Sequence, residues 1–493
     1  MERTGAMEVV LAAFRAPRRL RILARVLAWP FRWLGDRGDP ALPPATRALT
    51  ALGPAYIKFG QILSTRPDIV GDDLARQLRY LQDKLPPFDT ETARRMVAEE
   101  LEQPVDTLFA EFEPPVAAAS IAQVHPARVA ATGQKVAVKV LRPGIERAFR
   151  RDIDAFYFAA RMVEIVMPST RRLRPTDVIA HFESVVMGEL DLRLETAAAA
   201  EFAANTEEDE GFRVPRPIWL MSGRSMMTLD WAEGVPLGDN AALDAAGHDR
   251  QALGERVLQL FLNHALRDGY FHADMHQGNL KVGANGDIIA LDFGIMGRID
   301  DYTRRVYAEI LFGFIRKDYR RVAEVHFEAG YVPHDRDIDE FARALRSVGE
   351  PIFGMNATQI SMARLLNYLF EVTERFGMQT RTELILLQRT MVVVEGVARS
   401  LNPQINIWKI AQPVVEAYIR ENVGPRAALR DLARTARVLA RFGPKLPDLV
   451  ERELARLNAT PQPDPPPDLT RRAGWVALGA ALGAAAVWVV IRL

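Results

Sequence analysis

The alternation of hydrophobic and polar positions predicts a helical start, a short region of strands and a long helical remainder. Residues 1–105 carry amphipathic runs typical of helices, separated by prolines. Apolar residues then recur at every second position, as in half-buried strands, in TLFAEFE (107–113), QVHPARVA (123–130) and QKVAVKVLRP (134–143). Helices are expected over about 144–167 and 176–207, and further strands in FRVPRPIWLM (212–221) and SMMTLDWAEG (225–234).

From about residue 239 the pattern is mainly helical, with one interruption. Within NLKVGANGDIIALDFG (279–294), Asn285-Gly286 lies between two short apolar runs, which is a strong signal for a β-hairpin. Five strands with one long helix, followed by a helical region with a small hairpin, indicate an α+β protein with the two-lobed fold of kinases. The expected domains are a helical extension (1–105), a smaller lobe (106–235) and a helical lobe (236–445).

The C-terminal end predicts a linker and a membrane span. The run PQPDPPPD (461–468) cannot be helical, so 446–472 is interpreted as a proline-rich linker. Residues 473–491 carry no charge and span about 28 Å as a helix, close to the thickness of the hydrocarbon layer. Trp475 and Trp488 lie near its ends, where interfacial indoles are found. We therefore expect a transmembrane helix at 473–491, with a buried alanine-rich helix as the alternative.

The charges around this span predict its topology. Arg471 and Arg472 precede it and Arg492 alone follows it, which favours lobes in the cytoplasm at a bacterial inner membrane. Gly479 and Gly483 would let two such helices approach closely and form a homodimer, although they are equally compatible with lipid.

A second candidate for membrane contact lies at the other end of the chain. From Arg15 to Arg32 there are six arginines and no acidic residue, interleaved with aliphatic and aromatic side chains. Such a helical segment can lie on an anionic membrane surface or pack its apolar stripe on its own domain. The sequence leaves both readings open.

Composition adds two constraints. A hydrophobic content of 48% and a charged content of 26% describe a globular protein, and 63 basic against 63 acidic residues give no indication of a nucleic-acid partner. The chain contains no cysteine, which excludes disulfides, thiolate metal sites and cysteine nucleophiles.

The chemistry-bearing residues cluster around the predicted hairpin. In HADMHQGN (272–279), Asp274 and Asn279 are separated by four residues, and Asp292-Phe-Gly follows thirteen residues after Asn279. Phosphoryl transfer needs a group that orients or deprotonates the acceptor, a role for Asp274, and hard oxygen ligands for Mg²⁺, which Asn279 and Asp292 supply. His272 is expected to brace the loop.

A lysine completes the predicted nucleotide site. Lys139, on the third predicted strand, would hold the α- and β-phosphates of ATP and pair with a carboxylate on the following helical stretch. Asp191 and Glu195 are four residues apart and are expected to share one helix face, whereas Glu189 points elsewhere. Glu195 is the favoured partner of Lys139.

Together these motifs resemble the UbiB family of atypical kinase-like proteins, also called AarF or ABC1. YIKFGQILSTRPDIV matches its KxGQ signature at Lys58, Gly60 and Gln61, AAASIAQV matches its alanine-rich loop, and Glu189 to Asp191 match its ExD element. HADMHQGN matches its catalytic loop, with Met275 where the family usually has proline. The resemblance covers roughly residues 45–440. It implies Mg²⁺ and ATP as cofactors, a role in ubiquinone biosynthesis, and a KxGQ segment that folds over the site with Lys58 and Gln61 facing the ExD acids.

The alanine-rich loop is the least expected part of the nucleotide site. Ala117, Ala118, Ala119 and Ser120 stand where a phosphate-binding loop usually has glycines. Alanine resists the left-handed backbone that glycine allows, at roughly 1–2 kcal/mol, and the loop has good helix propensity. We expect a short rigid turn and nucleotide binding that differs from that of protein kinases.

The segment after Asp292-Phe-Gly also argues against a protein kinase. Asp300 and Asp301, which predict a helix start, follow within six positions, so no room remains for an activation segment that docks a peptide. The expected function is that of a membrane-anchored ATPase or small-molecule kinase acting with membrane lipid, a prenylated quinone precursor and other ubiquinone-biosynthesis proteins. A soluble small-molecule kinase of the aminoglycoside or choline type and a non-catalytic scaffold are the alternatives.

Overall fold

The computed structural model describes residues 42–64, 70–78, 80–81, 86–166, 174–354 and 382–423, with a few single positions elsewhere. The predicted linker (446–472), the predicted span (473–491) and, apart from Ile22, the basic N-terminal segment lie outside the described residues. Within the described ranges, no helix combines the length and the apolar composition that crossing a membrane requires.

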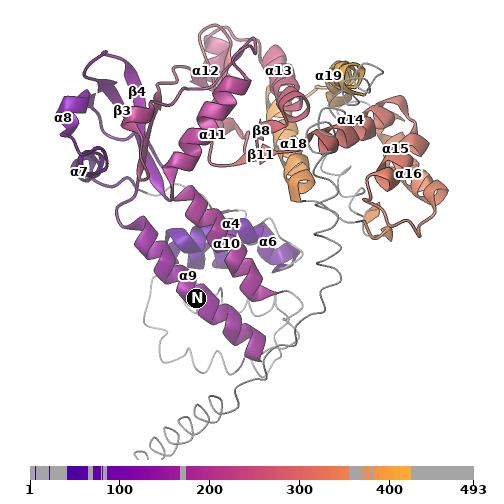
Figure 1. The fold of residues 1–493 in the computed structure, drawn as a ribbon, viewed down its shortest axis with the longest axis horizontal. Helices are drawn as coiled ribbons and strands as arrows, with labels where there is room; N and C mark the ends of the chain where they lie inside the picture. The colour runs from indigo at the N-terminus through magenta and orange to yellow at the C-terminus, as the bar shows by residue number, and fades with distance from the viewer. Residues whose placement is uncertain are drawn as a thin grey trace, which may run out of the picture. The chain divides into compact units, whose positions relative to one another are not determined.

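A five-stranded sheet forms the smaller lobe (Figure 1). Its order is β1-β3-β4-β6. β2 pairs with the start of β3, at Gln123 and Val124, on the same edge as β1. The strands are β1 (Phe109–Phe112), β2 (Ala117–Ala118), β3 (Ala122–Val129), β4 (Lys135–Leu141) and β6 (Met226–Asp230). Four of them confirm predicted strands, and in β4 the residues Val136, Val138 and Val140 are fully buried, as the alternation indicated.

The predicted strand at 212–221 is wrong in most of its length. Only Phe212–Arg213 (β5) is a strand, and it pairs in parallel with β10 of a second sheet, while Trp219–Met221 (η3) is a 3₁₀ turn. Pro215 and Pro217 interrupt the segment, because proline cannot donate a ladder hydrogen bond. The fifth strand of the first sheet is instead β2, within the alanine-rich loop.

The predicted helix at 176–207 is two helices. After α9 (Ile145–Val166), the chain forms α10 (Pro175–Glu189) and α11 (Leu192–Asn205). Asp191 is extended, with φ −116°, and its carboxylate accepts a hydrogen bond from the backbone N–H of Arg193, which caps α11. Glu189 therefore ends one helix and Asp191 caps the next, so the expectation that Asp191 and Glu195 share one helix face is wrong.

Aromatic packing holds the helical extension against α9 and α10. The extension contains α3 (Pro44–Leu52), α4 (Pro54–Ser64), α6 (Asp72–Leu78), α7 (Thr90–Leu101) and α8 (Val105–Leu108). Phe59 of α4 stacks on Phe156 of α9 at 4.8 Å between ring centroids and meets Phe182 of α10 edge-on at 5.1 Å. Gly60 faces the other way, where an added Cβ would lie 2.3 Å from Leu81 Cδ1. This close approach gives the glycine of KxGQ a packing role.

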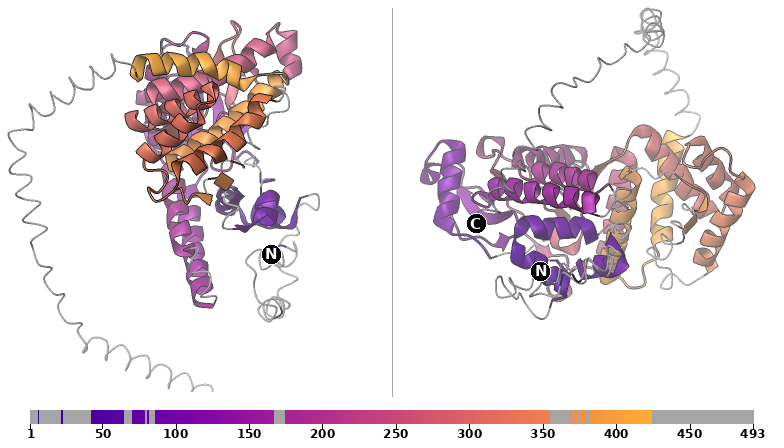
Figure 2. Two further views of the ribbon diagram at one scale, coloured as in Figure 1. Left: turned by 90° about the vertical axis from the view of Figure 1, so that its right-hand side faces the viewer. Right: turned by 90° about the horizontal axis from the view of Figure 1, so that it is seen from below.

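The larger lobe is helical apart from short sheets. Its helices are α12 (Asn240–Ala245), α13 (Arg250–Asn263), α14 (Asp301–Arg316), α15 (Tyr319–Glu328), α16 (Ile338–Gly354), α18 (Thr382–Leu401) and α19 (Ile407–Asn422), with a π-helical turn η4 (His264–Asp268). Helix α13 packs between α18 and α19 (Figures 1 and 2). The main core joins α13 and α18 to the segment around Met275 and Phe293.

Three short strand pairs carry the predicted site. β9 (Leu280–Val282) and β10 (Ile288–Ala290) form the hairpin expected from Asn285-Gly286, and Gly286 has φ +81° at its turn. β7 (Val235–Pro236) pairs with β9, and β8 (Tyr270–His272) with β11 (Met296–Arg298). Residues 231–234 connect β6 to β7, close to the predicted domain boundary at 235–236. All the domain boundaries given above stay predictions.

A buried histidine in the larger lobe should make stability depend on pH. His326 donates from Nδ1 to the carbonyl of Val322, 2.7 Å away, and its ring meets Tyr331 and Phe341 edge-on. Burial lowers its pKa to about 4, against about 6.5 in an unfolded chain. Because the unfolded chain then binds the proton more tightly, His326 stabilises fully above about pH 6.5 and loses up to about 3 kcal/mol as the pH falls toward 4.

Denaturant unfolding of the parent and of His326→Phe at about pH 7 and pH 4.5 checks this prediction. The variant should lose less stability between the two pH values, since phenylalanine keeps the aromatic packing without a titrating group. The exposed His334→Gln is the control and should behave as the parent. Equal losses in all three proteins would remove His326 as the cause.

Candidate active site

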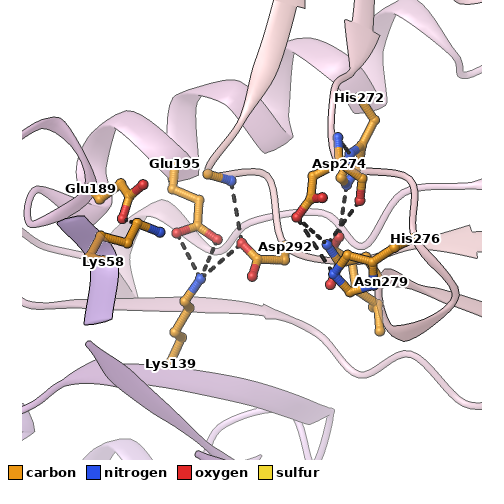
Figure 3. Close-up of polar contacts among 11 residues, drawn as sticks. Lys58, Lys139, Glu189, Glu195, His272, Asp274, His276, Asn279 and Asp292 are labelled. Atoms are coloured by element: carbon orange, nitrogen blue, oxygen red, sulfur yellow. Dashed lines mark hydrogen bonds and ion pairs between the residues drawn. The ribbon is translucent and has the colours of Figure 1, made fainter. Parts of the chain in front are cut away.

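Three charged side chains from three elements meet beside β4 (Figure 3). Lys139 Nζ of β4 donates to both carboxylate oxygens of Glu195 on α11, at 2.6 and 2.9 Å. The same ammonium lies 3.3 Å from Asp292 Oδ1, which follows β10. The predicted pairing of Lys139 with Glu195 is therefore present in the structure.

This cluster fixes two ionisation states. Burial alone would lower the pKa of Lys139, but the carboxylates of Asp292 and Glu195 outweigh it and raise the pKa, so the ammonium stays charged. In turn, the Lys139 ammonium holds the pKa of Asp292 well below its usual range. The site thus presents a permanent cation beside a permanent anion, a fitting arrangement for phosphate oxygens and a divalent cation.

His272 braces the catalytic loop as the sequence indicated. Its imidazole is fully buried, donates from Nε2 to the carbonyl of Leu291 at 2.9 Å, and accepts at Nδ1 from the N–H of Asp274 at 3.1 Å. Burial lowers the pKa of His272, so the neutral tautomer that makes both bonds is favoured. The ring ties the loop directly to the strand end that leads into Asp292.

The side chains of Asp274 and Asn279 lie next to each other (Figure 3). Asn279 donates from Nδ2 to the backbone carbonyl and to Oδ2 of Asp274, at 3.0 and 3.2 Å. This leaves Asn279 Oδ1 available as a ligand. Asp292 adopts a left-handed backbone, φ 59°, and the N–H of Gly294 donates to its Oδ1 at 3.4 Å. Asn279 Oδ1 and the Asp292 carboxylate are oxygen ligands that fit Mg²⁺, which accepts two protein donors together with phosphates and water.

The alanine-rich loop is a strand hairpin, so the expected short turn is present at its tip, whereas the helix propensity of its alanines does not produce a helix. Ala117 and Ala118 pair with Val124 and Gln123 of β3, and no residue of the hairpin has a positive φ. At the tip, Arg142 donates from Nε and Nη2 to the carbonyl of Ala119, at 3.0 and 2.9 Å. Ser120 is buried beside it. A guanidinium on the tip carbonyl makes the loop rigid without the left-handed backbone that glycine provides.

The KxGQ helix reaches the ExD element through one ion pair. Lys58 Nζ of α4 lies 2.8 Å from Glu189 Oε2, and both side chains are mostly buried. Asp191 instead pairs with Arg193 at 2.6 Å. Gln61 is half-buried on the same helix, and its side chain forms no hydrogen bond with either acid in the part of the chain that the structure describes. Of the expected contacts with the ExD acids, the structure thus contains the one between Lys58 and Glu189.

The segment after Asp292 leads straight to the next helix. β11 pairs with β8 beside His272, and α14 begins at Asp301 with the Asp300 carboxylate accepting from Thr303 N–H at 2.7 Å. The capping predicted at Asp300 is confirmed. No segment remains between β11 and α14 that could form a peptide-docking platform.

Sequence reasoning missed the residues that join the lobes. Trp231 lies in the connection between β6 and β7, and two lysines contact its ring. Lys135 Nζ of β4 is 4.5 Å and Lys281 Nζ of β9 is 5.5 Å from the ring centroid. Lys281 also donates to the carbonyl of Ala232 at 2.9 Å. These lysines are 146 positions apart in the chain, and no local pattern relates them.

A separate pocket of about 280 Å³ lies near this connection and includes none of the predicted site residues. Its wall combines the end of α11, β5, residues 230–232 and Ile289 of β10. Within it Arg216 pairs with Glu207 at 2.6 Å. The candidate site is thus defined by its charges and hydrogen bonds, not by this cavity.

Two family profiles match the chain. Residues 80–326 match the ABC1 atypical kinase-like domain, and residues 345–406 match the UbiB helical domain. A probable protein kinase UbiB of Marinobacter nauticus is 40% identical over 418 residues, which cover 84% of this chain and 76% of the relative. A protein of the same name from Pseudomonas aeruginosa is 38% identical over 466 residues, covering 93% of this chain and 86% of the relative.

A solved structure supports the fold. The complex of Rv3197 with erythromycin from Mycobacterium tuberculosis superposes with a TM-score of 0.52 and 23% identity, covering 80% of this chain and 97% of that one. The fold and the charged cluster define an atypical kinase-like protein. Within that class, the chain belongs to the ABC1 family of the UbiB type, which confirms the resemblance drawn from its motifs.

Proposed function

We propose that the protein is a Mg²⁺-dependent ATPase or small-molecule phosphotransferase that supports the biosynthesis of ubiquinone or another prenylated quinone. The observation that carries this proposal is the position of Lys139 between Glu195 and Asp292, with Asp274 and Asn279 lying next to each other. Membership of the UbiB-type family, which the sequence resemblance associates with ubiquinone biosynthesis, supports the link to quinone synthesis.

Each residue has a defined task in the proposed reaction. Lys139 holds the α- and β-phosphates, and Glu195 keeps its ammonium in place. Mg²⁺ held by Asn279 and Asp292 would supply charge neutralisation at the phosphates. Asp274 orients the acceptor hydroxyl or water and takes its proton as the acceptor oxygen forms its bond to the γ-phosphorus. His272 fixes the backbone N–H of Asp274 and takes no proton in the step.

The acceptor is small or is water. Helix α4 lies over the ExD element through the Lys58–Glu189 ion pair, and α14 follows β11 directly, so both features that a protein kinase uses to bind peptide are replaced. A soluble small-molecule kinase of the aminoglycoside or choline type remains the runner-up, and it differs from the leading proposal in needing no lipid.

We also propose that the protein acts at the cytoplasmic face of a bacterial inner membrane. The apolar run at 473–491 and the arginines before it support this placement, and they would bring a membrane lipid, a prenylated precursor and other biosynthetic proteins near the site. The pair Gly479 and Gly483 supports a homodimer through the same helix.

ATP hydrolysis by the purified full-length chain, with and without phospholipid vesicles, tests the proposal. We expect Mg²⁺-dependent hydrolysis that vesicles stimulate, and flotation with vesicles that is largely lost when the chain ends at Asp468. Residual flotation of the truncated chain would point to the basic N-terminal segment. Hydrolysis that is indifferent to lipid in both proteins would favour the soluble small-molecule kinase, and no hydrolysis at all would favour a scaffold.

A further inference from the structure

Helix α9 presents a row of exposed apolar side chains along its outer half. Phe158 is 67% exposed, Met162 38% and Ile165 62%, and Ala155 is exposed one turn earlier. These four residues follow one another at intervals of three, four and three positions, the spacing that places side chains on one helix face. Single exposed apolar residues are ordinary, but a contiguous row marks a surface that binds something apolar. We call this row the outer stripe.

The inner face of α9 is fixed, so the outer stripe is a preformed surface. Phe156 meets Phe182 of α10 edge-on at 5.7 Å between ring centroids. Near the end of α9, the carboxylate of Glu164 accepts from the hydroxyl of Thr176 at 2.8 Å. The two helices are therefore held together along their length, and α9 extends away from the five-stranded sheet (Figures 1 and 2).

Arginines border the outer stripe and give this face a positive charge. Arg147 and Arg151 continue the row toward the start of the helix at four-residue intervals, and Arg161 directly precedes Met162. All three arginines are exposed, and the exposed acidic residue described on α9 is Asp154. Three arginines against one aspartate leave two positive charges. An apolar row bordered by basic side chains is the composition of helices that lie at the surface of an anionic membrane.

The same charges argue against two other occupants of the outer stripe. A second copy of the chain would bring its own arginines onto this face, and so would the basic N-terminal segment, which has six arginines and no acidic residue between positions 15 and 32. Four apolar side chains on one helix are also few for a specific protein interface, which takes about 20–30 residues a side. A lipid surface needs no matching shape and accommodates a narrow row.

We propose that the outer stripe docks α9 on an anionic membrane surface. Phe158, Met162 and Ile165 enter the boundary between headgroups and acyl chains, and Arg151 and Arg161 bind lipid phosphates beside them. This inference rests on the proposed action at a membrane and does not depend on phosphoryl transfer. It gives the kinase-like domain a membrane contact of its own, separate from the apolar run at 473–491.

A single fluorescent probe on the outer stripe tests this inference. The chain contains no cysteine, so Met162→Cys provides one labelling site for a dye that emits at shorter wavelength in an apolar environment. Ser184→Cys, at an exposed position of α10 outside the stripe, is the matched control. The labelled full-length chain is placed in lipid nanodiscs of phosphatidylcholine, alone or mixed with phosphatidylglycerol. We expect a shift to shorter wavelength and quenching by spin-labelled lipid at position 162 in the anionic discs, a much smaller effect in the neutral discs, and none at position 184.

A second variant separates docking from a change of fold. Adding Phe158→Glu to Met162→Cys should remove most of the shift, whereas thermal unfolding should be unchanged because Phe158 is largely exposed. If the discs retain the chain and positions 162 and 184 respond alike, this inference fails and the proposed membrane placement stands. A chain that the discs do not retain would overturn both. An equal shift in both types of disc, which residues 1–41 or a second copy of the chain would produce by covering the stripe, would also refute docking on anionic lipid.

Discussion

Asp292→Asn is expected to abolish Mg²⁺-dependent turnover, by roughly 10³-fold or more in kcat, because it removes the anionic ligand of the metal ion. Asparagine keeps the shape of the side chain, and Lys139 keeps Glu195 as its partner at 2.6 Å, so the fold should survive. Nucleotide binding in the variant should lose its dependence on Mg²⁺. Calorimetric titration of ATP with and without Mg²⁺, together with a hydrolysis assay, measures both effects.

The control for this substitution lies in the same hairpin. Asp287 has its Oδ2 3.4 Å from Arg213 Nε and makes no contact with Lys139, so Asp287→Asn removes the same charge five residues from the site. It should leave Mg·ATP binding and turnover near those of the parent. Retained Mg²⁺-dependent hydrolysis in Asp292→Asn would refute the assignment of the whole motif.

The second large effect is expected at the ion pair between the KxGQ helix and the ExD element. Lys58→Ala removes the 2.8 Å contact with Glu189, whereas the stacking of Phe59 on Phe156 and Phe182 remains and should keep α4 in place. We take the partly buried ion pair to stabilise the position of α4 over the ExD element by about 1–2 kcal/mol. Its loss would then raise the fraction of molecules in which α4 has moved away from the site by roughly tenfold. We expect higher basal hydrolysis or self-phosphorylation and reduced quinone production in cells.

Arg76→Ala is the matched control, since it removes one positive charge from the same helical extension at an exposed pair with Asp73. Thermal unfolding should show both variants folded. The rate of phosphate release and incorporation of labelled phosphate into the protein then compare the parent with each variant. If Lys58→Ala and Arg76→Ala show the same rates of phosphate release and of phosphate incorporation, the ion pair between Lys58 and Glu189 does not control access to the site.

The central site residues were predictable because short-range rules place them. Asn285-Gly286 forces a tight hairpin, and a hairpin of this length returns the chain so that Asp292 lies beside Asn279. Lys139 was predictable from strand alternation, since it follows two buried valines on β4. Its pairing with Glu195 needed one added inference, that the helix carrying Glu195, the third after β4, packs beside this sheet.

Other parts of the site depended on contacts that no local pattern contains. The alanine-rich loop has helix propensity, yet it is a strand, because β3 offers it a partner edge and Arg142 binds the carbonyl at its tip. In the same way Thr390 reaches the loop at Ala273 from more than a hundred residues away in sequence. Tertiary packing overrides a weak local preference in such cases.

By itself the sequence determined the two-lobed fold class, the family and the charged residues that meet in the candidate site, since these follow from periodicity, turn chemistry and motif spacing. Only the tertiary structure decided how the acids of the ExD element pair. It places Glu189 with Lys58 and Asp191 with Arg193, because the chain breaks between α10 and α11 and turns these neighbouring acids in different directions. Charge interactions weaken with distance and are largely screened beyond about 10 Å, so the partners of each charge depend on three-dimensional distances that spacing along the chain does not contain.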